Sequence, residues 1–303
     1  MQTAPYVWQR GLPGCSFTSA YEATISHSLC KTHTMYMKKC FFLLTSLVLT
    51  VLMATAQFDD KFYFPSRNMR PIDSSLNAEK ITLRTDTVEL TGLFIKPAGK
   101  PKATVLFFHG AGGNISSYLF MTRPLVEKGY QVLMADFRGY GKSTGTPTHL
   151  NILKDGQLFF DYLQKREELK GTRLIIFGAS IGTQIAAKMA HDNKDKVAGL
   201  ILDGPMSSFT DIAITYAPAE QHAMIRQFLT SPYAAKTDVT QIGNIPLLVV
   251  ASKGDKECPF AHAMVVYDAA TGPKAMWEYE GGHLEAMKVN PAEYLKRIDG
   301  LLK

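Results

Sequence analysis

The chain has few cysteines, and their positions exclude a fold held by disulfides. Of four cysteines among 303 residues, Cys15, Cys30 and Cys40 all precede residue 57. Only Cys258 follows, so the remainder of the chain cannot form an internal disulfide. Its apolar core must stabilise the fold without covalent cross-links.

The chain also lacks long runs of like charge. Residues 57–303 hold 29 lysines and arginines against 26 acidic residues, with no basic block. This near balance gives no support for nucleic-acid binding. No internal repeat is present, and with 46% apolar and 20% charged residues the composition is that of a globular protein.

A single long apolar run lies near the N-terminus. Two lysines precede an apolar stretch from Cys40 to Met53, and the small residues Ala54-Thr55-Ala56 follow it. This pattern is typical of a secretory signal peptide over residues 37–56. We therefore expect an exported protein, either periplasmic or secreted.

A retained membrane anchor at residues 40–56 is the alternative, because about 17 apolar residues are near the shortest length that spans a bilayer. Membrane contact is expected only through such an uncleaved leader. Residues 1–36 show no periodicity and are interpreted as an upstream or non-native leader. The remaining residues, 57–303, are a suitable length for a single α/β domain.

Short, continuous apolar runs predict strands that are buried on both faces of a parallel sheet. Amphipathic segments between these runs predict helical crossovers. An alternating pattern over Glu79–Lys96 predicts an antiparallel hairpin at one edge. The expected strands are 103–109, 131–137, 173–177, 199–202, 246–251 and 275–279, and the expected helices are 118–128, 150–169, 181–192, 260–269 and 291–302.

The connection over residues 206–244 is too long for a simple crossover. It carries aromatic and other apolar residues in a mostly helical pattern, and long insertions of this kind are commonly functional. We expect a small helical cap above the carboxyl ends of the strands. The alternative is that its aromatic side chains simply pack on one another.

A serine between two glycines follows the strand predicted at 173–177. The motif Gly178-Ala179-Ser180-Ile181-Gly182 precedes a predicted helix. A strained strand-to-helix turn needs both glycines for close packing and exposes the serine oxygen. Ser180 is therefore the candidate nucleophile, although a helix-capping serine is the competing interpretation.

A glycine-rich loop, His109 to Asn114, follows the first buried strand. Backbone N–H groups in such a loop can bind an oxyanion together with the amide of the residue after the nucleophile. Ala111 and Ile181 are the candidate oxyanion-hole donors. Neither common phosphate-binding glycine motif fits the loop.

A serine nucleophile needs a base, and the base needs a carboxylate that fixes its tautomer. His283 follows a late strand behind two glycines, and Asp255 follows the strand before it. Ser180, Asp255 and His283 are therefore the candidate triad, with Asp203 as the alternative acid. Cys258, in the loop after Asp255, is expected to serve in packing.

These motifs together resemble the α/β-hydrolase fold, with a mostly parallel central sheet flanked by helices. Within that fold they resemble the group that includes the eukaryotic protein-depalmitoylase-like serine hydrolases and their bacterial relatives. The similarity covers residues 78–302. Its motifs are HGAGGN (109–114), DFRGYGKS (136–143), GASIG (178–182), SKGD (252–255) and GGH (281–283).

The resemblance implies hydrolysis of a small-molecule acyl ester or thioester through an acyl-enzyme, without a metal or other cofactor. It also implies that residues 136–141 form a structural loop with no catalytic role. Two alternatives stay open at this point. One is a serine peptidase of the same fold acting on short peptides, and the other is a non-catalytic binding protein, because fold alone does not fix function.

Overall fold

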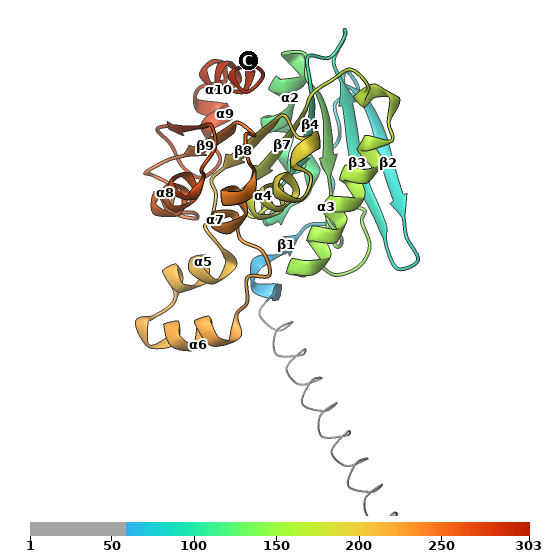
Figure 1. The fold of residues 1–303 in the computed structure, drawn as a ribbon. Helices are drawn as coiled ribbons and strands as arrows, with labels where there is room; N and C mark the ends of the chain where they lie inside the picture. Colours follow the sequence, from blue (N-terminus) through green and yellow to red (C-terminus); the bar gives the residue numbers. More distant parts are fainter. Residues whose placement is uncertain (1–58) are drawn as a thin grey trace, which may run out of the picture. The chain divides into compact units, whose positions relative to one another are not determined.

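The central feature of the fold is an eight-stranded sheet. The computed structural model describes residues 59–303 (Figure 1), so the predicted leader, residues 1–56, lies outside the described part. The strands of the sheet are β2 (Asn77–Arg84), β3 (Glu89–Lys96), β4 (Thr104–Phe108), β6 (Gln131–Ala135), β7 (Leu174–Ala179), β8 (Gly199–Asp203), β9 (Leu247–Ala251) and β10 (Lys274–Glu278).

The strand order is β10-β9-β8-β7-β4-β6-β3-β2. All neighbours from β10 to β6 run parallel, whereas β3 is antiparallel to both β6 and β2. The predicted mostly parallel sheet with a hairpin at one edge is therefore confirmed. Parallel order aligns the carboxyl ends of β4, β7, β8, β9 and β10 along one edge.

Helices cover both faces of the sheet (Figure 1). One face packs against α3, α4, α7 and α8, and the other against α2, α9 and α10. Their bounds are α2 Leu119–Glu127, α3 His149–Gln164, α4 Gly182–Asp192, α7 Ala235–Asp238, α8 Phe260–Ala269, α9 Ala286–Val289 and α10 Pro291–Gly300.

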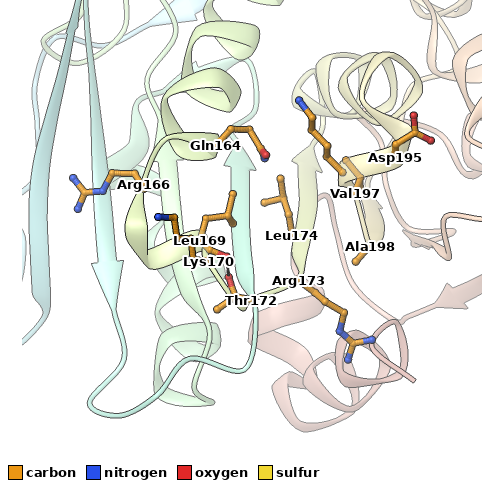
Figure 2. Close-up of a pocket in the computed structure, with 11 residues that line it drawn as sticks. Gln164, Arg166, Leu169, Lys170, Thr172, Arg173, Leu174, Asp195, Val197 and Ala198 are labelled. Carbon is orange, nitrogen blue, oxygen red and sulfur yellow. Dashed lines mark hydrogen bonds between the residues drawn. The ribbon is translucent and has the colours of Figure 1, made fainter.

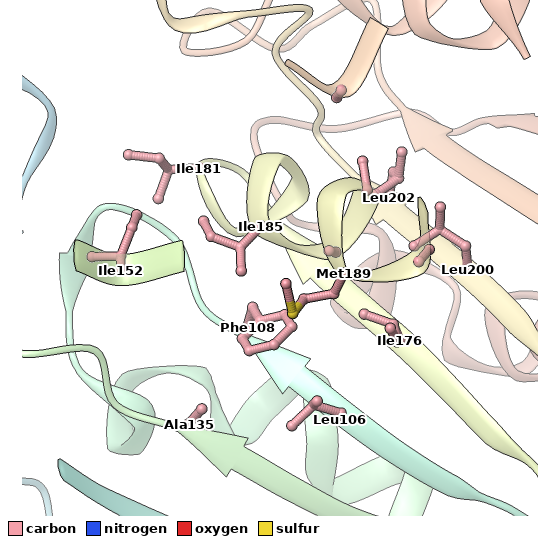
Figure 3. Packing of buried hydrophobic residues seen from close by; sticks show 14 of the residues in the cluster. Leu106, Phe108, Ala135, Ile152, Ile176, Ile181, Ile185, Met189, Leu200 and Leu202 are labelled. Atoms are coloured by element: carbon pink, nitrogen blue, oxygen red, sulfur yellow. The ribbon is translucent and has the colours of Figure 1, made fainter. Parts of the chain in front are cut away.

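Alternate residues of each strand belong to two separate core clusters. In β4, Leu106 and Phe108 pack on one face, and Val105 and Phe107 pack on the other. Figure 3 shows the first cluster, where Ile185 of α4 lies against Phe108. Among the described residues, both clusters lie within residues 63–301.

The insertion over residues 206–244 is helical, as the sequence predicts. It comprises α5 (Phe209–Tyr216), the short 3-10 turns η5 (Ala219–Gln221) and η6 (Val239–Gln241), α6 (His222–Phe228) and α7. Phe209 and Tyr233 are buried, whereas Met224 and Phe228 are about half exposed. The insertion therefore packs partly on the core and partly leaves apolar side chains uncovered.

The segment before the first predicted strand has a definite structure that the sequence pattern does not reveal. Residues 59–66, here called the arm, form the 3-10 turn η1 (Asp60–Phe62) and the strand β1 (Phe64–Pro65). Strand β1 pairs in parallel with β5 (Gly112–Gly113), within the glycine-rich loop. No helix of residues 59–303 is long and apolar enough to cross a membrane.

Candidate active site

The candidate residues lie beyond the carboxyl ends of three strands in the same half of the sheet, β7, β9 and β10. Ser180 directly follows β7, Asp255 lies four residues after β9, and His283 lies five residues after β10. Ligand sites of open parallel sheets occur at this edge. The fold therefore brings three separate segments of the chain to one corner.

Ser180 occupies a strained turn between β7 and α4. Its φ angle is +54°, a left-handed conformation that non-glycine residues rarely adopt. A methyl group on Gly178 would lie 2.4 Å from the Gly182 carbonyl oxygen, and one on Gly182 would lie 2.3 Å from the Phe108 oxygen. Both glycines are therefore required for this turn to pack, as the motif predicts.

His283 and Asp255 form a buried pair. The His283 Nδ1 lies 2.6 Å from Asp255 Oδ2, and the other carboxylate oxygen accepts the amides of Glu257 and Cys258 at 2.8 Å each. Burial alone would lower the pKa of His283, but the hydrogen bond and charge of Asp255 outweigh it and raise the pKa above 6.5. The pair thus holds a proton on Nδ1 and leaves Nε2 as the basic nitrogen.

Gly204 brings the imidazole close to the serine turn. The Ser180 amide donates to the Asp203 carbonyl at 2.8 Å, and a methyl group on Gly204 would lie only 2.8 Å from His283 Cε1. The buried Nε2 of His283 has no hydrogen-bond partner within residues 59–303. No hydrogen bond joins Ser180 to His283 in this state, and such contacts commonly tighten only when substrate binds.

Gly204→Ala is expected to lower kcat by about 10²-fold, because displacing a catalytic group by about 1 Å has a cost of that order. The added methyl group would push the imidazole aside, and φ at this position is +58°. Gly243→Ala is the matched control, since its φ is +64° but no atom lies within 4 Å of the added methyl group. Steady-state kinetics should separate the two variants, and equal losses would contradict contact with His283 as the cause.

The alternative acid, Asp203, has a different partner. It is fully buried, and its Oδ2 accepts the Tyr294 hydroxyl at 2.8 Å, whereas Oδ1 has no partner among the described residues. Burial raises its pKa to about 7. It is Asp255, and not Asp203, that is hydrogen-bonded to His283.

The position of the glycine-rich loop is fixed by hydrogen bonds that its carbonyl oxygens accept. Ala111 O accepts the Tyr140 hydroxyl at 2.7 Å and the Phe64 amide at 2.9 Å, while Gly112 O accepts the Tyr118 hydroxyl at 3.0 Å. Within the described residues, the amides of Ala111 and Ile181 donate to no acceptor. These two amides are the donors predicted for the oxyanion hole, and both are therefore available to a ligand.

The arm is part of the site's framework, although sequence patterns gave no sign of it. Besides the Phe64 contact, the Ser66 amide donates to Gly113 O at 2.8 Å, and the Asn114 side-chain amide donates to Ser66 O at 3.0 Å. His149 connects the arm to the cap, because its Nδ1 lies 2.7 Å from Tyr63 Oη and its ring stacks on Phe209. The arm is therefore hydrogen-bonded to the loop that carries Ala111 and fixes its position.

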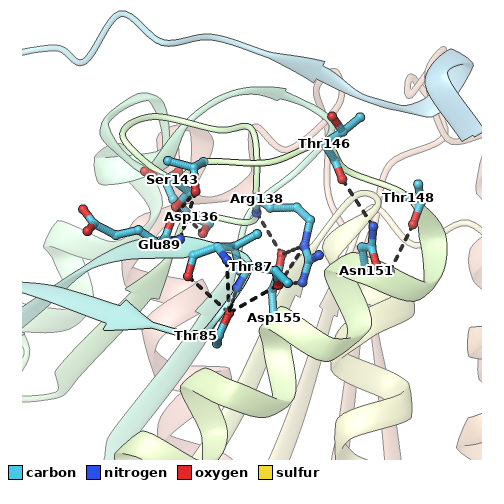
Figure 4. Close-up of polar contacts among 12 residues, drawn as sticks. Thr85, Thr87, Glu89, Asp136, Arg138, Ser143, Thr146, Thr148, Asn151 and Asp155 are labelled. Carbon is cyan, nitrogen blue, oxygen red and sulfur yellow. Dashed lines mark hydrogen bonds and ion pairs between the residues drawn. The ribbon is translucent and has the colours of Figure 1, made fainter.

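Residues 136–143 form a loop that polar contacts hold in place (Figure 4). Arg138 is anchored to the buried Asp155 through its amide at 2.8 Å and its Nε at 3.0 Å. Ser143 Oγ donates to Asp136 O at 2.9 Å and accepts the Thr91 amide at 2.8 Å. These contacts give Arg138 and Ser143 structural roles.

An apolar pocket of about 410 Å³ opens beside Ser180. It lies between the arm and the cap, and its lining is mostly aliphatic and aromatic. Cys258 Sγ lies 4.0 Å from Ser180 Oγ, and burial raises the pKa of this thiol to about 12, so it remains protonated. The other lining residues are Lys61, Phe62, Phe64, Ala111, Ile181, Met206, Ile212, Ala213, Tyr216, Gln221, Met224, Ile225, Leu229 and Glu257.

A second hollow, of about 460 Å³, lies at the opposite end of the strands, next to the starts of β7 and β8 (Figure 2). Its lining contains none of the candidate residues. Arg166 points away to Glu79 and Glu168, at 2.7 and 2.6 Å, and Arg173 donates to Leu302 O. We assign no function to this hollow.

Comparison with known proteins identifies the family. The protein YfhR of Escherichia coli O157:H7 is 30% identical over 74% of this chain and 80% of its own length. The α/β hydrolase domain-containing protein WAV2 of Arabidopsis thaliana is 30% identical over 66% of this chain and 69% of its own. The chain belongs to the α/β-hydrolase superfamily.

A solved member of the superfamily shares the fold. The esterase Pf2001 of Pyrococcus furiosus superposes with a TM-score of 0.63 at 21% identity, over 79% of this α/β hydrolase and 98% of the esterase. A family model described as serine aminopeptidase, S33, matches residues 99–242. That match includes Ser180 but ends before Asp255 and His283.

Proposed function

We propose that this α/β hydrolase is a serine hydrolase that cleaves carboxylic ester or thioester bonds. Ser180 is the nucleophile, His283 the base, Asp255 the acid, and the amides of Ala111 and Ile181 form the oxyanion hole. The observation that carries the proposal is the left-handed backbone at Ser180, with φ at +54°, beside the hydrogen-bonded pair of His283 and Asp255. Such strain is characteristic of a nucleophile held on a sharp turn.

Nε2 of His283 accepts the Ser180 proton as Oγ attacks the acyl carbonyl carbon. The two free amides bind the oxyanion that forms. The tetrahedral species collapses, His283 returns the proton to the departing alcohol or thiol, and the acyl group stays on Ser180. Water then attacks the acyl-enzyme with the same base, which releases the acid and restores the serine.

The pocket lining favours an apolar acyl group. Only Lys61 and Glu257 carry charge among the lining residues, so a charged substrate would lack partners over most of the surface. An apolar chain, in contrast, gains from burial against Met206, Ile212 and Leu229. This supports an ester or thioester of an apolar acid.

A serine peptidase is the second candidate, favoured by the description of the matching family model. A peptidase that binds a free amine needs a carboxylate facing the substrate. In the cap, Asp211 is already bound to Lys236 at 2.6 Å and to the Ser207 hydroxyl at 2.7 Å, and Glu220 does not line the pocket. Glu257 is left as the one lining carboxylate.

A comparison of p-nitrophenyl acyl esters with aminoacyl p-nitroanilides tests the two candidates. We expect a higher kcat/KM for the esters, and an increase as the acyl chain is lengthened from acetyl, because the pocket buries the added methylenes. Glu257→Gln should leave ester turnover nearly unchanged. Faster hydrolysis of an anilide, abolished by Glu257→Gln, would favour the peptidase.

The raised pKa of His283 predicts the pH dependence of ester hydrolysis. The base must be neutral in the free enzyme, so kcat/KM should be low at acidic pH and rise through the His283 pKa. Because the Asp255 contact raises this pKa, the midpoint should lie above 6.5. A pH profile of kcat/KM measures it, and a midpoint below 6.5 would contradict the pairing.

A further inference from the structure

Exposed apolar side chains are concentrated around the mouth of the pocket. Among the described residues, seven large hydrophobic side chains are exposed, and three of them line the pocket. A fourth, Phe228, lies one helical turn beyond the lining residue Met224. We call these four the apolar rim: Phe64, Tyr216, Met224 and Phe228.

Helix α6 carries two of the four rim residues, Met224 and Phe228, on one of its faces. It contains no buried residue. Met224 and Ile225 line the pocket, and Met224 and Phe228, four residues apart on one face, are 46% and 47% exposed. An exposed apolar patch beside a ligand pocket is typical of a surface that contacts a partner or a lipid phase.

The charges around the rim do not point to an oppositely charged partner. Lys61 lies 3.8 Å from Asp60 in the arm. Arg226 lies on α6, and the carbonyl oxygen of Lys256 accepts the Tyr216 hydroxyl. Glu220, in contrast, lies in the turn before α6 and Glu257 lines the pocket, so cations and carboxylates are balanced here. A surface that binds anionic partners carries clustered lysines and arginines, which this one lacks. The contact that the rim favours is therefore apolar.

The sequence upstream of the arm favours a lipid surface as that partner. The apolar run of residues 40–56 is predicted to enter a membrane, as a signal peptide or as an anchor. Lys61, which lines the pocket, is only five residues beyond Ala56, and five extended residues span at most roughly 18 Å. A retained leader would thus keep the pocket mouth near the bilayer.

We infer that the apolar rim inserts into a lipid surface, and that the ester or thioester hydrolysed at Ser180 carries a lipid acyl chain drawn from that surface into the pocket. The second part rests on the proposed function, whereas the first does not. Insertion would bury Phe64, Met224 and Phe228 and place the pocket mouth against the acyl chains. The substrate would then reach Ser180 without crossing water.

Vesicle flotation of residues 57–303 tests the insertion, since this part holds both core clusters and lacks the apolar leader. The vesicles are of zwitterionic phosphatidylcholine. Phe228→Ser should weaken partitioning about tenfold, from the loss of one inserted aromatic side chain. Val265→Ser is the matched control, because Val265 is 46% exposed on α8 but does not line the pocket.

Binding should also be insensitive to salt between 0.05 and 0.5 M, because apolar insertion is not screened. Equal flotation of the Phe228→Ser and Val265→Ser proteins, or no flotation of the unsubstituted protein, would overturn the inference. A dimer that Phe228→Ser dissociates, in a protein that does not bind vesicles, would instead assign the rim to a second copy of the chain.

Hydrolysis separates failure of the inference from failure of the proposed function. Phe228→Ser should leave turnover of a soluble short-chain ester unchanged, while its hydrolysis of an ester embedded in vesicles should fall about as much as its binding. Unchanged hydrolysis of the embedded ester would contradict the inference. If the unsubstituted protein hydrolyses no ester at all, the proposed function is refuted, whereas the flotation result stays valid.

Discussion

Replacing Ser180 by alanine is expected to lower kcat for a p-nitrophenyl ester by about 10⁶-fold, the scale of the loss when a triad serine is removed. Alanine keeps the backbone and removes only the attacking oxygen. The amides of Ala111 and Ile181 remain, so some catalysis above the uncatalysed rate should persist. Steady-state kinetics, with thermal unfolding to verify the fold, measure the effect.

Ser74→Ala is the control for this experiment, because Ser74 is exposed and distant in sequence from every candidate residue. Its turnover should equal that of the unsubstituted protein. Turnover retained by Ser180→Ala would require another nucleophile. A folded protein that hydrolyses no ester and reacts with no serine-directed probe would support the non-catalytic binding protein instead.

Asp255→Asn is expected to lower kcat by about 10⁴-fold, because an amide favours the wrong imidazole tautomer and does not stabilise the imidazolium. The pKa that Asp255 raises should fall as well, which would move the acidic limb of the kcat/KM profile to lower pH. Both readouts come from one series of rate measurements. The shifted limb identifies an effect on His283 that a merely structural defect would not produce.

Asp203→Asn is the matched comparison, since both carboxyl groups are buried at the ends of neighbouring strands. Asp203 bonds to Tyr294 and not to His283, so we expect its substitution to cost at least 10²-fold less turnover than Asp255→Asn. Substitution with asparagine preserves the side-chain volume in both cases. The opposite order of losses would make Asp203 the acid.

Much of the fold follows from local patterns. Continuous apolar runs locate the buried strands because both faces of a parallel sheet pack against helices, as Phe107 and Phe108 illustrate. Helix α8 has the predicted bounds, Phe260–Ala269. The helix expected over residues 150–169 was wrong at its end, since α3 stops at Gln164 and a separate 3-10 turn, η3 (Glu167–Leu169), follows.

The residues of the candidate triad could be selected because chemistry at this edge of a sheet follows strand ends. Their geometry was predictable only where a motif fixes the backbone, as Gly178 and Gly182 do around Ser180. Gly204 was missed although it directly follows a strand and Asp203. Its importance arises from contact with His283, which is 79 residues away in the sequence and enters no local pattern.

The arm and the apolar rim could not be found from the sequence for the same reason. Strand β1 is only two residues long, and its partner lies in a loop nearly fifty residues later. Phe64, Met224 and Phe228 are ordinary apolar residues until the fold leaves them exposed at one pocket mouth. Of the aromatic side chains in the insertion, Phe209 is buried in the core and Phe228 is exposed at the surface.

The most direct test of the central claim is to map the site of a covalent adduct. The native protein is treated with a fluorophosphonate, digested, and its peptides are sequenced by mass spectrometry. We predict a single adduct on Ser180, formed at a rate that falls steeply when His283 is replaced by alanine. An adduct on any other residue, or no adduct on a folded protein, would contradict the account.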